Sequence, residues 1–340
     1  MNRISVFLIL SLLGLSVLFT GCGSESESGK NVAVTFANSS ASWQRNGDTI
    51  KKTLESEGFA VDLQFADSDK QQIEQLKAMI ESKPRCIVIG AVNSGALGEV
   101  LKEAKEQQIP VIAYDRLVMN TDAVSYYASF DNEGVGQAMG EYIEAALNLK
   151  SGAGPFNIEV FAGDPGDNNA HLFFSGAMDV LKPYFEKGQL VCPSRETSFD
   201  QVATKDWNPK NAQARMEKLL TANYSDGKPL HAVLSPNDGC AGGIVEALAN
   251  KGYSGPQPII TGQDADPAAL ENIRQGKQTI TIFKNPELLT SKCVRMIKAV
   301  VEGVQPDIND VKTYNNGSIT VPAYLCTPYI IDKDNIDMVK

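Results

Sequence analysis

The sequence predicts an α/β protein with two doubly wound domains, and three observations lead to that prediction. After residue 30, short apolar runs alternate with longer segments of helical periodicity. The apolar runs are nearly continuous, which is typical of parallel sheets covered by helices on both faces. The alternation starts again in the second half of this 340-residue chain, which is long enough to bury two cores.

The first half supplies strands and helices in alternation up to its last strand. Gly58 closes the first helix, and Leu97, Val100, Leu101 and Ala104 share one face of the third. The predicted strands cover residues 31–37, 59–66, 86–91, 109–114 and 124–130, and the predicted helices cover residues 42–58, 69–83 and 94–108.

The second half repeats the pattern. Its predicted strands cover residues 156–163, 189–196, 231–236, 258–264 and 278–284, and its predicted helices cover residues 168–187, 208–224, 238–252, 267–276 and 286–303. No linker rich in Pro, Gly or Ser separates the halves. We therefore expect the domains to be joined by short, strand-like crossings.

Composition and charge argue against several kinds of partner and site. The net charge of −10 argues against a nucleic-acid partner and against charge-driven docking on anionic lipid, since both attract basic patches. The cysteines after residue 30 are odd in number and widely scattered, no CxxC occurs, and the chain has 2 histidines. We therefore expect buried single thiols, no metal site and no cofactor.

The N-terminus is predicted to be an export signal. Arg3 precedes an apolar run that is too short and too lightly flanked for a membrane span. The run ends in LFTGC, which resembles a bacterial lipobox, so residues 1–21 are expected to be removed and Cys22 to be lipidated. Residues 22–30 would then be a lipid-anchored tether that holds an exported protein on the cell membrane, facing the periplasm or the exterior. The alternative is a stray cysteine after a conventional signal peptide.

Polar side chains gather where the predicted strands end. In open parallel sheets, ligands bind outside the carboxyl ends of the strands. This rule selects residues 38–43, 91–94, 115–116, 164–169, 236–238 and 263–264, together with Lys284. At one of these junctions Asp115 stands directly before Arg116, at the end of an apolar strand. We expect this pair to face a cleft, each residue orienting the other.

The residue types at these junctions suit a sugar. A carboxylate accepts two O–H bonds, a guanidinium donates two, a carboxamide does one of each, and aromatic rings cover the apolar faces of the sugar. The candidates are Asp115, Arg116, Asn169, Asn237, Asp264 and Lys284, with Trp43 and Trp207 as aromatic platforms. Plainer roles are open as well: a helix cap for Asp164 and Asp238, helix packing for Trp207, and a solvated charge for Arg116 and Lys284.

A family resemblance covers nearly the whole chain after residue 30. The chain contains, in order, AYDRL, YYASFDNEGVG, GDPGDNNAHLFFSGAMDVLKPY, DWNPKNAQARM, LSPNDGCAGG, TGQDAD and TIFKNPELL. Together these segments resemble the periplasmic sugar-binding proteins of the ribose, xylose and galactose type, most closely the xylose-binding and multiple-sugar-binding receptors. The resemblance implies the periplasmic binding protein type I fold, with two Rossmann-like domains on a hinge of three crossings.

The resemblance also implies a domain division and a set of ligand contacts. Residues 31–130 with 285–321 would form the N-terminal lobe and residues 131–284 with 322–340 the C-terminal lobe, bending near 130–131, 283–284 and 320–321. The family's sugar contacts fall on Asp115, Arg116, Asn169 with Asn168, Trp207, Asn237, Asp264 and Lys284. Close relatives carry Arg before Trp near the first strand, where this chain has Ser42 before Trp43, and Asn38 or Ser39 is the expected compensation.

We therefore expect a monomeric binding protein that closes around an aldose of the xylose, glucose, galactose or arabinose class and delivers it to an ABC permease. One alternative is a sensor that presents sugar to a histidine kinase or chemoreceptor. The other is a carbohydrate-active enzyme, which we do not expect, since the chain has no GxSxG elbow, no Walker loop and no GxGxxG after the first strand.

Overall fold

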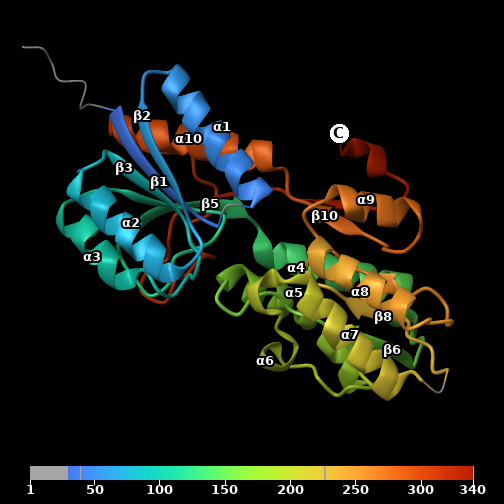
Figure 1. Ribbon diagram of the computed structural model, residues 1–340. Helices are drawn as coiled ribbons and strands as arrows, with labels where there is room; N and C mark the ends of the chain where they lie inside the picture. The colour runs from blue at the N-terminus through green and yellow to red at the C-terminus, as the bar shows by residue number, and fades with distance from the viewer. Residues whose placement is uncertain (1–29, 39, 226, 340) are drawn as a thin grey trace, which may run out of the picture.

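The computed structural model describes residues 30–38, 40–225 and 227–339, so the predicted signal peptide, Cys22 and Ser39 lie outside the described residues. Within the described part the chain forms two lobes, each with a parallel sheet between helices (Figure 1). The prediction of an α/β protein with two parallel-sheet domains is confirmed. In the same residues, no helix is long and apolar enough to cross a membrane.

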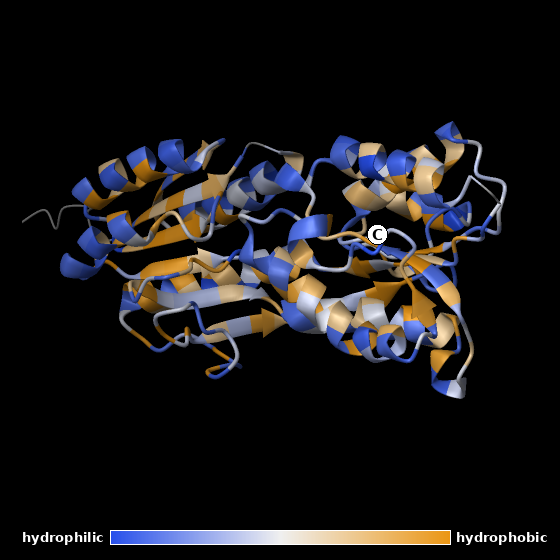
Figure 2. Ribbon diagram, turned by 90° about the horizontal axis from the view of Figure 1, so that it is seen from below, coloured by the Kyte–Doolittle hydropathy of each residue, from blue (hydrophilic) through white to orange (hydrophobic). Residues whose placement is uncertain are grey.

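The first lobe is a six-stranded parallel sheet in the order β11-β5-β4-β3-β1-β2. Its strands are β1 (Asn31–Ala37), β2 (Ala60–Ala66), β3 (Cys86–Gly90), β4 (Val111–Tyr114), β5 (Val124–Phe130) and β11 (Ala323–Cys326). Helices α1 (Ala41–Ser56) and α10 (Pro286–Glu302) pack on one face, and α2 (Asp69–Glu81) and α3 (Gly98–Glu106) pack on the other. The central strands β1, β3 and β4 are therefore buried on both faces, as their continuous apolar runs predict, and these strands are largely hydrophobic in Figure 2.

The second lobe contains a parallel sheet in the order β7-β6-β8-β9. Its strands are β6 (Phe156–Val160), β7 (Leu190–Val191), β8 (Ala232–Leu234) and β9 (Ile259–Ile260), and β10 (Thr281–Phe283) joins through a parallel bridge between Gln263 and Ile282. Helices α4 (Asn132–Ala146) and α5 (Asn168–Glu186) cover one face, and α7 (Pro209–Asn223) and α8 (Asp238–Asn250) cover the other. Two shorter helices, α6 (Phe199–Val202) and α9 (Pro267–Arg274), and strand β12 (Tyr329–Ile331) complete this lobe.

The third crossing between the lobes lies later than expected. The family resemblance predicts it near Thr320–Val321, but β11 pairs in parallel with β5 and so belongs to the first lobe. The chain crosses only after Cys326, because β12 pairs antiparallel with β10 of the second lobe. A short apolar run gives no indication of the sheet that it joins, since that choice depends on strands distant in the sequence.

Helix α4 is absent from the sequence-based assignment. Its glycines lower helix propensity, but they permit close packing against α5. A Cβ on Gly136 would lie 2.0 Å from the carbonyl oxygen of Phe173, and a Cβ on Gly140 would lie 2.9 Å from that of Ala177. Close contact between the two helices therefore outweighs the local propensity.

Candidate functional site

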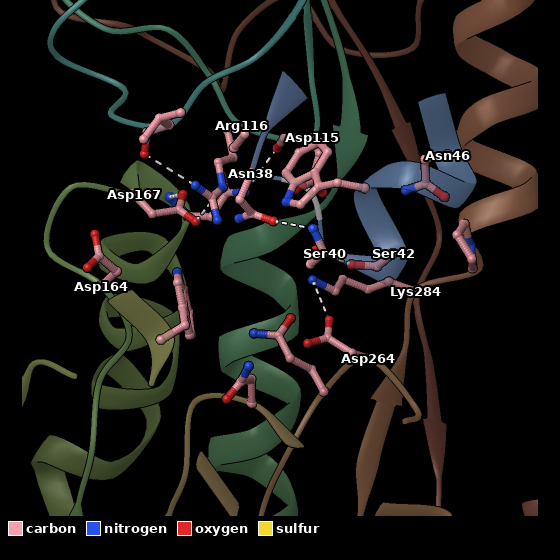
Figure 3. A pocket seen from close by; sticks show the side chains of 18 of the residues that line it. Asn38, Ser40, Ser42, Asn46, Asp115, Arg116, Asp164, Asp167, Asp264 and Lys284 are labelled. Carbon is pink, nitrogen blue, oxygen red and sulfur yellow. Dashed lines mark hydrogen bonds and ion pairs between the residues drawn. The ribbon is translucent and has the colours of Figure 1, made fainter. Parts of the chain in front are cut away.

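A cavity of about 620 Å³ lies between the two lobes, at the ends of their strands. Loops that follow β1, β3 and β4 supply the wall from the first lobe, and loops that follow β6, β8, β9 and β10 supply the wall from the second. Figure 3 shows polar side chains from both lobes pointing into this space. Of the predicted residues, the cavity lining includes Trp43, Asp115, Arg116, Asn169, Trp207, Asn237, Asp264 and Lys284.

Asn168 is the one predicted contact that does not line the cavity. Its backbone N–H donates to the Ser94 hydroxyl of the first lobe at 3.3 Å. The neighbouring Ser94 N–H donates to the carbonyl of Gly166 at 3.0 Å. This segment therefore joins the two lobes beside the cavity, and Asn169 alone of the two asparagines reaches the cavity wall.

The loops around the cavity hold several non-glycine residues in the left-handed region of backbone conformation. Their φ angles are 45° at Asn38, 61° at Asp115, 58° at Asp206, 53° at Trp207 and 103° at Asp264. Such conformations persist only where the surrounding structure determines them strongly, and they are enriched in ligand-binding sites. Their gathering around one cavity marks it as the candidate site.

Asp115 presents an unpartnered carboxylate to the cavity. Its backbone carbonyl accepts hydrogen bonds from Tyr127 Oη at 2.7 Å, Ser129 Oγ at 2.8 Å and Asn169 Nδ2 at 2.9 Å. Within the described part of the chain, nothing donates to its side-chain oxygens. Burial raises the pKa of this carboxyl, and Lys284 counteracts the increase. The backbone is thus firmly held while the carboxylate stays free for a ligand.

Arg116 pairs with Asp167 rather than with Asp115. Its Nε lies 2.9 Å from Asp167 Oδ2, and both side chains are largely buried (Figure 3). Its Nη1 donates to the carbonyls of Ala91 and Val92 at 3.1 and 3.3 Å. The expectation that Asp115 and Arg116 orient each other is therefore wrong: the partner of Arg116 comes from the other lobe.

Lys284 and Asp264 form a second ion pair, with Lys284 Nζ 3.0 Å from Asp264 Oδ1. Lys284 is only 14% exposed, so it is not a solvated loop residue. Burial opposes the charge on Lys284, but Asp264, Asp115 and Asp167 outweigh burial, and the pKa of this lysine is raised. The ammonium also lies 5.2 Å from the centre of the Phe173 ring. Lys284 therefore remains cationic and held in place in the cavity wall.

The two carboxamides have different surroundings. Asn237 caps helix α8 through Oδ1, which accepts from the backbone N–H of Cys240 at 2.9 Å. The Oδ1 atom of Asn169 accepts from Asn132 Nδ2 at 3.0 Å and Tyr127 Oη at 3.3 Å, while its Nδ2 donates to the Asp115 carbonyl. Asn169 thus ties the loop after β4 to the second lobe, a role that its sequence position did not indicate.

The two tryptophans also differ. Trp43 is only 8% exposed and packs in the core, with its ring 5.1 Å from that of Phe36 and the Arg116 guanidinium 5.6 Å from its ring centre, although it also contributes to the cavity lining. Trp207 lines the cavity with a buried Nε1 that has no hydrogen-bond partner in the described residues. Oε1 of Gln263, another lining residue, is likewise buried and unpartnered. Each of these two lining residues therefore contains one buried polar atom that has no partner within the described residues.

Several lining residues were missed by the sequence analysis. Asp167 and Gln263 fall within junctions that it selected, but nothing local distinguishes them from their neighbours. Arg45 lies on α1 two residues after Trp43, and it reaches the cavity from a helix rather than from a strand end. Asn38 and Ser42 line the cavity too, whereas Ser39 is outside the described residues.

Carboxylates outnumber cations in the lining. Its acids are Asp67, Asp115, Asp164, Asp167, Asp206, Asp264 and Asp266, and its cations are Arg45, Arg116 and Lys284. An anionic ligand would be repelled at short range. A neutral molecule with several hydroxyls would find charged acceptors, charged donors and aromatic surface within one cavity.

The comparisons with known proteins agree with this geometry. A model of the periplasmic binding protein domain matches residues 32–305. The multiple sugar-binding periplasmic receptor ChvE of Rhizobium radiobacter is 45% identical over 88% of this chain and 86% of its own length. The D-xylose-binding periplasmic protein of Escherichia coli (strain K12) is 37% identical over 86% of this chain and 84% of its own length.

A solved structure is also similar to this chain. The ABC transporter solute binding protein from Clostridium phytofermentans, with bound β-D-glucose, has a TM-score of 0.88 and 45% identity, covering 91% of this chain and 96% of its own. The predicted fold and the resemblance stated from the sequence are confirmed. The chain belongs to the periplasmic binding protein domain family.

Proposed function

We propose that this protein binds one neutral monosaccharide between its lobes and delivers it to an ABC importer. The observation that carries the proposal is the cavity itself, where the carboxylate of Asp115, which accepts no hydrogen bond within the described residues, lies with polar and aromatic side chains from both lobes. A buried polar group without a partner costs free energy, and a sugar hydroxyl supplies both a donor and an acceptor. The cavity volume of about 620 Å³ is within the range typical of small-molecule sites.

The proposed contacts divide between the lobes. From the first lobe, Asp115 accepts two hydroxyl hydrogens, and Arg116 donates from the nitrogens that its protein partners leave free. From the second lobe, Asn237, Asp264 and the Trp207 ring hold the opposite side of the sugar. Asn169, Lys284 and Trp43 complete the enclosure, as their places in the lining allow. Because both lobes contact the ligand, binding favours the closed arrangement of the lobes.

The ligand class proposed is an aldose such as glucose, xylose, galactose or arabinose. The excess of carboxylates in the lining argues against sugar phosphates and sugar acids. The relative with bound β-D-glucose and the relative named for D-xylose support the same class. We propose binding without catalysis, so that an oligosaccharide incubated with the protein stays intact.

The experiment is a thermal-shift screen of the mature protein against aldopentoses and aldohexoses, followed by isothermal titration calorimetry. A neutral aldose is expected to raise the melting temperature, while glucose 6-phosphate and glucuronate at equal concentration leave it unchanged. If no neutral monosaccharide shifts the transition at millimolar concentration, or only the anionic sugars do, the proposal is wrong.

We also propose that Cys22 carries a lipid that holds the protein on the outer side of the cell membrane. The support is the LFTGC segment after the apolar run. Cells that express the full chain should incorporate labelled palmitate into the protein, and Cys22→Ser should abolish the label. Equal labelling of the variant would show that the anchor lies elsewhere.

A further inference from the structure

We infer that Asp238, which does not touch the cavity, is a positioning residue that holds Asp264 in its binding conformation. The inference rests on the proposed function and names a determinant of the same site. Asp238 is the first residue of α8 and is only 4% exposed. Asn237 caps this helix, so the capping role considered for Asp238 belongs to its neighbour.

The carboxylate of Asp238 accepts hydrogen bonds on both oxygens. Oδ2 accepts from the backbone N–H of Asp266 and from Thr281 Oγ1, each at 2.9 Å. Oδ1 accepts from Gln278 Nε2 at 2.8 Å. These donors come from the loop after β9, from the approach to β10 and from the first residue of β10, so one buried side chain ties the loop that carries Asp264 to β10.

The loop that Asp238 holds is the strained one. Asp264 and Ala265 have φ angles of 103° and 55°, and conformations of this kind must be enforced by their surroundings. Each N–H of this turn has a specific acceptor: Asp264 donates to the Ile282 carbonyl at 2.9 Å, Ala265 to Thr281 Oγ1 at 3.1 Å, and Asp266 to Asp238. Asp238 is itself the acceptor for Asp266. It also accepts from the Thr281 hydroxyl, which is the acceptor for Ala265, so two of the three acceptors depend on Asp238.

Asp238 and Gln278 can lie this close to the end of β9 only because residue 262 is a glycine. A Cβ on Gly262 would lie 2.2 Å from Asp238 Oδ1 and 2.5 Å from Gln278 Nε2. The backbone N–H of Asp238 also donates to the Gln263 carbonyl at 3.0 Å. Asp238 and the strand end at residues 262–266 therefore fit together as one unit, and Asp264 projects from that unit into the cavity.

The test compares two substitutions of Asp238 by calorimetric titration with the aldose that binds the wild type. Asp238→Ala removes both acceptors, and we expect it to weaken binding by about tenfold or more. Asp238→Asn keeps an acceptor for Asp266 and Thr281 and loses only the acceptor for Gln278 Nε2, which still donates to the Ile280 carbonyl at 3.0 Å. It should therefore bind within about threefold of wild type. Glu246→Gln, an exposed carboxylate change on the same helix, is the control and should bind like wild type.

If Asp238 acts through Asp264, the effects of substituting these two residues on sugar affinity should not add. In an Asp264→Asn background, Asp238→Ala should have little further effect on affinity, whereas in an Asp115→Asn background its effect should persist. Equal losses in both backgrounds, or an Asp238→Ala protein that binds like wild type, would contradict the inference. Thr281→Val, which breaks the same link by an isosteric change, provides the same comparison if Asp238→Ala does not fold.

A second measurement separates this inference from the proposed function. Hydrogen exchange without sugar should show faster exchange of the Ala265 and Asp266 amides in Asp238→Ala than in Glu246→Gln, while the β6 amides stay protected. Unchanged exchange at residues 265–266 would overturn the positioning role whatever the ligand. If the wild type binds no aldose but Asp238→Ala still shows the faster exchange at residues 265–266, the proposed function alone is refuted.

Discussion

The ion pair between Arg116 and Asp167 joins the two lobes, and its removal by Asp167→Asn should weaken sugar binding. Asp167 has two separate interactions: Oδ2 pairs with Arg116 Nε at 2.9 Å, and Oδ1 caps α5 by accepting from the Asn169 N–H at 3.0 Å. Asparagine caps a helix about as well as aspartate does. The substitution therefore removes the charged partner of Arg116 and keeps the cap.

The magnitude follows from the burial of the pair. The side chains of Arg116 and Asp167 are 14% and 5% exposed, so solvent screens the pair weakly. A hydrogen bond to a charged group contributes about 1.5–3 kcal/mol, and Arg116 keeps its bonds to Ala91 and Val92. We expect a loss of about 2 kcal/mol of binding free energy, which corresponds to about 30-fold in Kd.

The assay is calorimetric titration of wild type and Asp167→Asn with D-glucose and D-xylose. Asp310→Asn is the matched control, because Asp310 Oδ1 caps a turn by accepting from the backbone N–H of Lys312 and Thr313 at 3.2 and 2.9 Å, and Asp310 does not line the cavity. Its Kd should stay within about twofold of wild type. An Asp167→Asn protein that binds as tightly as the control would show that the pair between the lobes makes no contribution to closure.

The remaining predictions concern Asp115 and Trp207. Asp115→Asn should weaken aldose binding by about 2 kcal/mol, measured by calorimetry, because the site loses its free carboxylate. Since burial raises the folded pKa of Asp115, its contribution to stability is full below the unfolded pKa of about 3.9 and is lost as pH rises through the folded value. The stability of Asp115→Asn relative to wild type, measured by thermal denaturation, should therefore increase from about pH 3 to about pH 7; a constant difference would contradict this. Trp207→Phe should abolish most of the change in tryptophan fluorescence on sugar binding and weaken binding about tenfold, whereas an unaltered response would assign the signal to Trp43.

Local sequence patterns predicted most of the elements. The bounds predicted for β1 and β5 agree with the structure, and those for α5 and α10 differ by one residue at the C-terminal end. In the second lobe the predicted strands were too long: β7 has 2 residues where eight were expected (189–196). Pro193 lies two residues after Val191 and has no N–H to donate to a ladder, so the strand ends before it.

The candidate site was predicted as a set of residue types more reliably than as a set of contacts. The residues chosen as candidate sugar contacts line one cavity, with Asn168 as the exception. Their pairing was not predictable, because the partner of Arg116 is distant in the sequence and comes from the other lobe. Asp238, read as a possible cap, is instead buried against the loop that carries Asp264.

The sequence by itself determined the alternation of strands and helices and the chemistry available at the strand ends, because periodicity and side-chain type are local properties. Only the tertiary structure decided which carboxylates are paired and which remain free. Asp264 is neutralised by Lys284, whereas the carboxylate of Asp115 has no hydrogen-bond partner within the described residues. That difference depends on the relative placement of two lobes whose residues meet across long separations in the chain, where no local pattern carries information.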